Sequence, residues 1–335
     1  MARGVRRVFV PLLLGLSLLA MLSGCNGSKH SAKPAPSTSA SLVPNSIAFW
    51  DAEHGLVGSG VTWKKTTGAI SATSDGGKTF RLVLRTPGPV VWVSTAGSSD
   101  AWAVVERCSP SGCVFSRLLH SSDRGKSWQR LAAPPVSSMS FATTSRGLAV
   151  TEKGQLLATG DGGRSWSGLS RPCSRSESEW FAPSGGVYLS LVTQRRAWAV
   201  CVGESSAGSQ AKTIFESVDG GKVWQMVANQ PVVGHSRVGS GGLSSYGYPQ
   251  GISFSAQGYG LLWESRGNLY LTRDGGHHWQ KLGIAAPEVD SGLSAVMLSR
   301  TRAFALLSRG GTYRLLSTTD GGRSWSVVQR WPAAR

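Results

Sequence analysis

Acidic residues are scarce in this chain, which has 18 Asp and Glu against 35 Lys and Arg and a formal net charge of +17. An active site built on paired carboxylates, such as that of a glycoside hydrolase, therefore has few residues to draw on. Histidine is also sparse, at six residues, and no Cys/His cluster has the spacing of metal ligands. From the sequence we expect no cofactor and no bound metal.

The N-terminal segment has the features of an export signal rather than of a folded element. Three arginines precede an apolar run, Val8–Leu22, that is too short to span a membrane comfortably. The run ends in Leu22-Ser23-Gly24-Cys25, which resembles a bacterial lipobox, where the Cys thiol is lipid-modified and becomes the new N-terminus. We expect residues 1–25 to be a lipoprotein signal peptide that anchors the protein through Cys25 at the extracytoplasmic side of the cell membrane. An ordinary signal peptide is the alternative, and the twin-arginine export route stays open.

The next segment, residues 26–45, is rich in Ser, Ala, Lys and Pro without apolar periodicity, which predicts a flexible tether. Residues 46–333 are long enough for one large domain. Without the three signal arginines, 32 basic residues face 18 acidic ones, a net charge of about +14. Outside the membrane this charge favours lipid head groups, envelope polymers or acidic protein as partners, and not nucleic acid; solubility alone is the simpler explanation.

One motif, [S/T]-x-D-x-G-x-x-[W/F], occurs six times at intervals of roughly 40 to 60 residues, the period of repeat architectures. Its Asp can accept backbone N–H groups of the residues that follow, and its first hydroxyl can join that network. The Gly at the fifth position suits a positive φ, and the terminal aromatic residue offers an apolar face. The motif is thus a structural turn. Its six aspartates are Asp75, Asp123, Asp161, Asp219, Asp274 and Asp320.

A second pattern precedes each motif, as in Phe49 followed by Gly55-Leu56-Val57. Together the two patterns predict that each unit contains four short strands, which we call strands a, b, c and d. Strand b starts at the Gly or Ala, and the motif forms the turn between strands c and d. Four-stranded units repeated radially make a propeller. We therefore predict an all-β fold, a β-propeller of about six four-stranded blades with Asp-box turns. The longest unassigned internal stretch, residues 228–250, is too short for a seventh blade.

The motifs resemble the Asp-box (BNR) repeat shared by sialidases, sortilin-like domains and propellers of the photosystem II assembly-factor type. Ile47 to Gly55 leading to Thr73 to Lys78 is most similar to the assembly-factor type. The resemblance covers nearly all of 46–333 and implies the fold. Because one fold hosts many functions, it does not by itself imply a role.

Strand alternation separates two faces of such a propeller. The a–b and c–d turns lie on one face, and the b–c and d–a connections lie on the other. The long connections all belong to the second face, where we expect binding.

Four cysteines remain after Cys25, and they allow three pairings. Their spacing and strand phase favour Cys108–Cys113 and Cys173–Cys201; Cys108-x4-Cys113 also has the form of half a zinc site, without a visible second half.

The predicted binding face combines basic, aromatic and acidic residues, and four glutamates follow strand b in their blades. With strand b placed toward the channel, these glutamates would contribute to a ring of mixed charge; surface or inter-blade ion pairs of little energetic worth are the alternative. Together they predict a rim that binds a protein or an anionic envelope polymer. The candidate residues are Trp63, Lys64, Lys65, Glu106, Glu152, Arg175, Trp180, Glu204, Arg237, Tyr246, Tyr248, Glu264 and Arg266.

Catalysis is the weaker hypothesis. A sialidase-type exo-glycosidase resembles this chain in its boxes, but the Phe-Arg-Ile-Pro type of motif expected near the first blade is missing, and Thr79-Phe80-Arg81-Leu82, the nearest phrase, falls on a box. A non-catalytic binding or scaffold propeller requires only a rigid disc, a face that carries binding residues, and a membrane anchor. A carbohydrate-binding lectin is a third possibility, since Trp and Tyr stack on sugar rings.

Overall fold

The computed structural model describes residues 43–61, 67–109, 111–173, 186–232, 238–266, 268–284 and 290–332. The predicted signal peptide, its lipidation site Cys25 and most of the predicted tether lie outside these ranges. Among the described residues there is no helix long and apolar enough to cross a bilayer. Every element in these ranges is a β-strand, and the strands form six antiparallel sheets of four.

Each sheet is one blade, made of four consecutive strands. The first contains β1 (Val43–Phe49), β2 (Gly55–Val61), β3 (Thr67–Thr73) and β4 (Arg81–Thr86). The second contains β5 (Val90–Ala96), β6 (Asp100–Ser109), β7 (Gly112–Ser121) and β8 (Gln129–Leu131). The third contains β9 (Val136–Phe141), β10 (Gly147–Thr151), β11 (Leu156–Thr159) and β12 (Ser167–Leu169). The fourth contains β13 (Val187–Leu191), β14 (Ala197–Ser206), β15 (Ser209–Ser217) and β16 (Gln225–Gln230). The fifth contains β17 (Tyr248–Phe254), β18 (Gly260–Ser265), β19 (Leu269–Thr272) and β20 (Trp279–Lys281). The sixth contains β21 (Asp290–Met297), β22 (Ala303–Arg309), β23 (Thr312–Thr318) and β24 (Ser326–Trp331).

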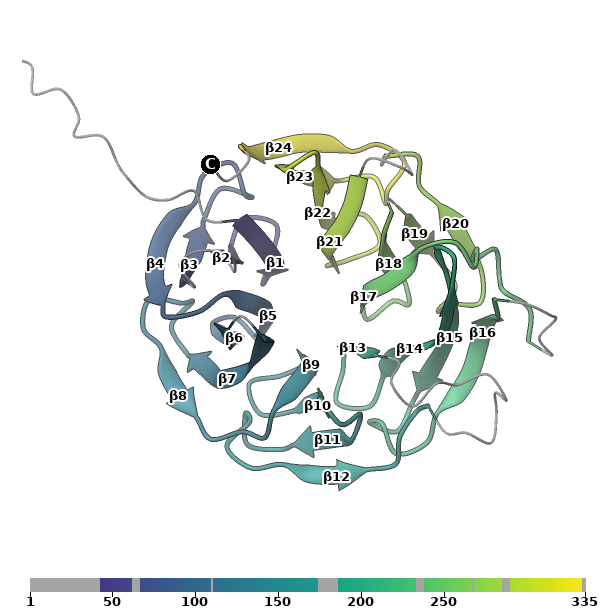
Figure 1. Cartoon of the computed structure of the whole chain (residues 1–335), viewed down its shortest axis with the longest axis horizontal. Helices are drawn as coiled ribbons and strands as arrows, with labels where there is room; N and C mark the ends of the chain where they lie inside the picture. Colours follow the sequence, from purple (N-terminus) through teal and green to yellow (C-terminus); the bar gives the residue numbers. More distant parts are fainter. Residues whose placement is uncertain are drawn as a thin grey trace, which may run out of the picture. The chain divides into compact units, whose positions relative to one another are not determined.

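The six blades form a closed ring, which confirms the predicted propeller and its blade number (Figure 1). Strand a of each blade is innermost, and the strands then follow in chain order to the rim. Strand b is therefore second from the centre, and the expectation that it lies toward the channel was wrong. A blade is narrowest at the axis, so a single strand a from each blade lines the centre.

The two faces are arranged as the strand alternation predicted. In every blade the backbone N–H after the box Asp donates to a carbonyl of the a–b turn, at 2.6–3.0 Å, so both kinds of turn share one face. We call this the box face. The b–c and d–a connections lie at the opposite ends of the same antiparallel strands. We call that side the loop face.

Each box is held by its own side chains. In the first blade, Thr73 Oγ1 donates to Asp75 Oδ1 at 2.8 Å and accepts the N–H of Gly77 at 2.9 Å. Hydrogen bonds from the side chain and backbone of Thr79 lower the pKa of Asp75 to about 2. The Gly at the fifth motif position has a φ of 80° to 95° in all six boxes, a conformation that L side chains rarely adopt. These local contacts agree with a structural turn.

The blades join in two alternating ways. In the even blades an Ala near the start of strand b is followed by Trp102, Trp198 or Phe304, and each ring stacks on a Phe at the end of the next strand a, with centroids 3.6–4.0 Å apart. In the odd blades strand b begins with Gly, and a Cβ at Gly147 would collide with the ring of Phe141. The ring thus consists of three blade pairs, because the aromatic stack occupies every second seam.

Serine hydroxyls connect the inner strands around a central channel of about 310 Å³. Ser190 Oγ accepts the N–H of Phe254 at 2.8 Å. Between the last blade and the first, Ser294 Oγ accepts the N–H of Ile47 at 3.1 Å. The same seam carries the stack of Phe49 on Phe304 at 3.8 Å. Side-chain packing and serine hydrogen bonds therefore close the ring between sheets that remain separate.

Candidate functional site

The candidate residues divide into those that the structure describes and those that it does not. Six lie outside the described ranges: Trp63, Lys64, Lys65, Arg175, Trp180 and Arg237. The other seven lie at loop-face strand ends or in loop-face connections: Glu106, Glu152, Glu204, Tyr246, Tyr248, Glu264 and Arg266. Four of these come together at the seam between blades four and five, and two at the seam between blades two and three.

Tyr246, Tyr248 and Arg266 form a cluster on the loop face, which we call the tyrosine–arginine cluster. The exposed guanidinium of Arg266 lies 5.8 Å from the ring centroid of Tyr246 and 5.6 Å from that of Tyr248. Both tyrosines are half-buried, so each presents part of its ring to solvent. Tyr and Arg are the residue types in which binding energy concentrates at protein interfaces. The cluster is therefore the best candidate binding surface among the described residues.

A buried ion pair lies beneath this cluster. Glu264 Oε1 accepts from Lys212 Nζ, and both side chains are completely buried. Asn268 Nδ2 donates to Glu264 Oε2 at 2.7 Å and to the carbonyl of Tyr246 at 2.8 Å. Burial raises the pKa of Glu264, and the contact with Lys212 opposes that shift. Glu264 was predicted as an exposed member of the binding face; it instead positions the cluster from below.

The connection before blade five is fastened to blade four by its backbone. The N–H of Gly247 donates to the carbonyl of Gly208 at 2.9 Å, and that of Gln210 donates to Ser245 at 2.8 Å. Gly247 has a φ of 98°, and any side chain there would collide with the carboxylate of Glu264. The sequence offered one overlooked signal of this arrangement: Lys212 stands in an otherwise apolar and small stretch of β15.

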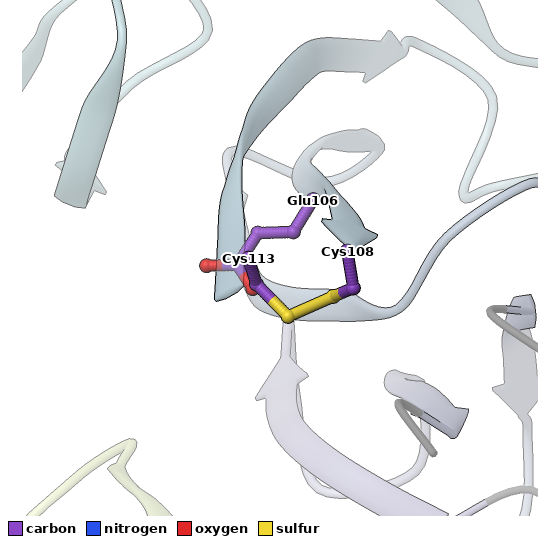
Figure 2. A group of neighbouring side chains, drawn as sticks. All are labelled: Glu106, Cys108 and Cys113. Atoms are coloured by element: carbon purple, nitrogen blue, oxygen red, sulfur yellow. A yellow bond between two sulfur atoms is a disulfide. The ribbon is translucent and has the colours of Figure 1, made fainter. Parts of the chain in front are cut away.

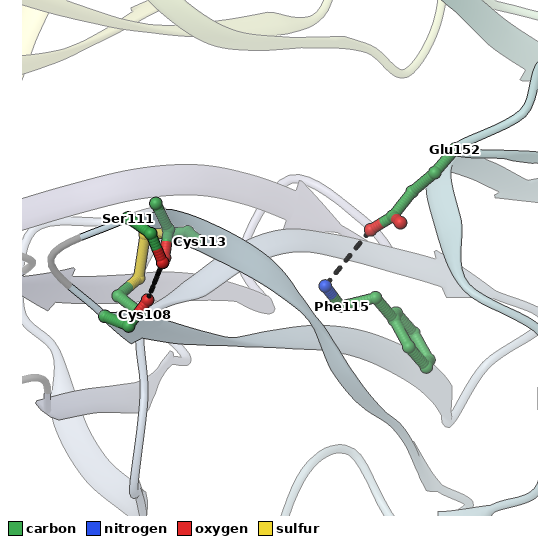
Figure 3. The surroundings of a disulfide bond; sticks show 7 residues. Cys108, Ser111, Cys113, Phe115 and Glu152 are labelled. Carbon is green, nitrogen blue, oxygen red and sulfur yellow. Dashed lines mark hydrogen bonds between the residues drawn. A yellow bond between two sulfur atoms is a disulfide. The ribbon is translucent and has the colours of Figure 1, made fainter.

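The second group surrounds the hairpin between β6 and β7. Cys108 and Cys113 face each other across the two strands and are joined by a disulfide, and Glu106 lies beside it (Figure 2). The carboxylate of Glu152 reaches over from blade three and accepts the N–H of Phe115 at 3.1 Å (Figure 3). Burial and the charge of Glu152 raise the pKa of Glu106. Glu106 from blade two and Glu152 from blade three therefore both lie near the seam between these blades.

The remaining cysteines pair as the sequence favoured, Cys173 with Cys201. Cys201 lies in the middle of β14 rather than at its loop-face end, because the strand continues to Ser206.

The predicted ring of mixed charge around the channel is absent from the described residues. The channel is lined almost entirely by the innermost strands, and Glu106, Glu152, Glu204 and Glu264 are not among its lining residues.

The box face carries a regular pattern of charge that we did not predict as a surface. The sixth motif position is exposed and basic in five boxes and histidine in the other. These residues are Lys78, Lys126, Arg164, Lys222, His277 and Arg323. The signal was present in the repeats, where a basic residue or His follows the Gly of every box. This ring of charge is the alternative surface for an anionic partner.

Comparison with known proteins identifies one homologue by sequence. No protein-family model matches the chain. The chain is 27% identical over 345 residues to the "Photosystem II assembly lipoprotein Ycf48" of Synechococcus sp. (strain CC9902), covering 95% of this chain and 86% of that protein. The chain is thus homologous to Ycf48 over most of its length, which confirms the resemblance to the assembly-factor type of propeller.

The chain is also similar to solved structures. One, "YCF48 bound to D1 peptide", is 19% identical with a TM-score of 0.48, covering 87% of this chain and 82% of that chain. Another, the SapL1 lectin in complex with alpha methyl fucoside, is 10% identical with a TM-score of 0.53, covering 88% of this chain and 97% of that chain. Similarity at this level of identity concerns the fold alone.

Proposed function

We propose that this chain is a non-catalytic propeller that binds a protein partner through its loop face and acts in the assembly of a larger complex. The observation that carries the proposal is the 27% identity, over 95% of the chain, to an assembly lipoprotein. The tyrosine–arginine cluster supports it, because a fixed pair of aromatic rings with an exposed guanidinium suits an extended protein segment. The net charge of about +14 in the mature chain favours a segment that is anionic.

The proposal includes a lipid anchor at Cys25 on the extracytoplasmic side of the membrane. It is supported by the lipobox-like Leu22-Ser23-Gly24-Cys25 and by the homologue, which is also a lipoprotein. Cys25→Ala should abolish labelling with a palmitate analogue and move the protein from the membrane to the soluble fraction. Unchanged labelling in this variant would contradict the anchor.

Binding can be tested by comparing two variants with the same change in charge. The first replaces Lys64, Lys65, Arg175 and Arg237, which the sequence predicts for the loop face, with Ser; the second replaces Lys78, Lys126, Lys222 and Arg323 on the box face with Ser. The parent chain serves as bait in its own envelope fraction, and the recovered partner is then titrated against each variant. The loop-face variant should bind more weakly, and the difference should shrink as salt rises, because exposed charges are screened beyond about 8–10 Å.

Two further variants separate packing from charge. Trp180→Ala and Tyr246→Ala should weaken binding with little dependence on salt, since their contribution is apolar contact. If the box-face variant loses binding while the loop-face variant keeps it, the loop face is the wrong surface. Hydrolysis of sialosides or related glycosides by the parent chain would favour the exo-glycosidase alternative instead.

A further inference from the structure

The hairpin of blade two places two sulfur atoms and a carboxylate close together. The Sγ atoms of Cys108 and Cys113 and a carboxylate oxygen of Glu106 all lie within 4.8 Å of one another (Figure 2). Glu106 and Cys108 are two residues apart on β6 and so share a face of the strand, while Cys113 is the direct partner of Cys108 on β7. The carboxylate of Glu106 adds a third potential metal ligand to the two cysteines that the sequence shows as half a zinc site.

This disulfide is more accessible than the other one, in which Cys173 is half-buried. Cys113 is exposed and Cys108 half-buried at the hairpin tip, whereas Cys201 of the second disulfide is completely buried. Exposed disulfides are the ones that exchange readily with thiols, and buried ones resist reduction. A dithiol reductant should therefore open Cys108–Cys113 and leave Cys173–Cys201 intact.

The hairpin is held by contacts other than the disulfide. Ser109 pairs with Gly112 in the ladder beyond the cysteines, and Ser109 Oγ donates to the carbonyl of Gly112 at 3.2 Å. The hydroxyls of Ser109 and Ser111 are 2.8 Å apart. After reduction the two thiols should thus stay opposite each other and beside Glu106, in place for a metal ion.

We propose that reduction turns this hairpin tip into a Zn²⁺ site with Cys108, Cys113 and Glu106 as ligands. Two thiolates and a carboxylate are ligands that Zn²⁺ prefers, and three protein ligands leave a fourth position open. The carboxylate of Glu152 binds the same hairpin at Phe115, two residues beyond Cys113, and so adds negative charge to this part of the loop face (Figure 3). In the disulfide form the sulfurs are bonded to each other and the site is closed.

The chemistry balances with a dithiol as the reductant. Two electrons and two protons pass to the disulfide, its S–S bond breaks to give two thiols, and the reductant forms its own disulfide. Zn²⁺ then displaces the two thiol protons into solvent as the metal–sulfur bonds form. The site would report the redox state of its surroundings by binding or releasing the metal.

The test uses the full chain, purified in detergent, reduced with dithiothreitol and freed of it under argon. Thiol counting should first find the two thiols of the opened hairpin, not those of Cys173 and Cys201. Added Co²⁺ should then give a thiolate-to-cobalt charge-transfer band that saturates at one equivalent, and Zn²⁺ should displace the Co²⁺, as its higher affinity requires. The untreated protein and Cys108→Ser/Cys113→Ser should give no band.

The Glu106→Gln variant keeps both cysteines but lacks the carboxylate ligand. Its metal affinity therefore distinguishes a three-ligand site from metal binding by the two thiols alone. Loss of outer partners typically costs about 10–100-fold in metal affinity, so loss of a ligand should cost at least about tenfold. Glu204 is an exposed glutamate near the end of the equivalent strand, β14, in blade four, so Glu204→Gln is the matched control and should leave the affinity unchanged. Equal affinity in Glu106→Gln and the parent, or no saturable band in a parent with two free thiols, would overturn the proposal.

Discussion

Replacing Glu264 by Gln should destabilise the protein by about 3–5 kcal/mol, since the ammonium of Lys212 would remain buried without its counter-charge. Both side chains are completely buried, so water cannot take the place of the lost carboxylate. Denaturant unfolding should show a lower midpoint for this variant. The tyrosine–arginine cluster should loosen as well, because Asn268 links Glu264 to the backbone of Tyr246.

Two comparisons make this result interpretable. Glu204→Gln removes the charge of an exposed glutamate and should change the free energy of unfolding by no more than about 0.5 kcal/mol. Lys212→Met/Glu264→Leu removes both charges and should recover much of the lost stability, as apolar replacements of buried ion pairs often do. A Glu264→Gln variant as stable as the parent would mean that the pair is not ionised in the folded protein.

Trp198→Ala should destabilise the protein by about 3–5 kcal/mol, the usual cost of deleting a buried aromatic side chain. The Trp198 ring is completely buried and stacks on Phe254 with centroids 4.0 Å apart, across the seam of blades four and five. Its Nε1 also donates to the carbonyl of Gly275 at 2.9 Å, which ties strand b to the box of the next blade. The variant loses both contacts at once.

The sixth blade provides the matched control, because Phe304 occupies the equivalent position and stacks on Phe49 without an indole N–H. Trp198→Phe should therefore keep the stack and lose only the hydrogen bond to Gly275, at a cost of about 1–3 kcal/mol. Thermal and denaturant unfolding measure both variants. If Phe proves as damaging as Ala, the hydrogen bond and not the stack holds this seam.

Much of the fold was predictable because its signals are local. Within an Asp box the side chain of Asp75 bonds to Thr73 and Thr79, both within four residues of it. Such a turn can be recognised from eight letters of sequence. Once six turns are placed, antiparallel alternation determines which connections share a face, and the loop-face position of the Cys108–Cys113 hairpin follows from that phase.

The loop-face site was predictable only in part. The sequence pointed to Tyr246, Tyr248 and Arg266 as separate surface residues, and the structure gathers them at one seam. The position of Lys212 in β15 was a signal of burial, but nothing in the sequence identified Glu264, 52 residues later, as its buried partner. That pair depends on how two blades approach each other, and no periodicity within either blade records it.

By itself, the sequence determined the all-β class, the blade number, the turns and the two faces, because each of these rests on contacts within a few residues or on the regular alternation of strands. Only the tertiary structure decided that strand a lines the channel, that blades join in pairs through Trp102, Trp198 and Phe304, and that Glu106 stands beside the Cys108–Cys113 disulfide. The physical reason is that these contacts join side chains across seams or across a hairpin. Their partners are chosen by packing and by the exclusion of water, which act on the assembled ring and not on any one segment of the chain.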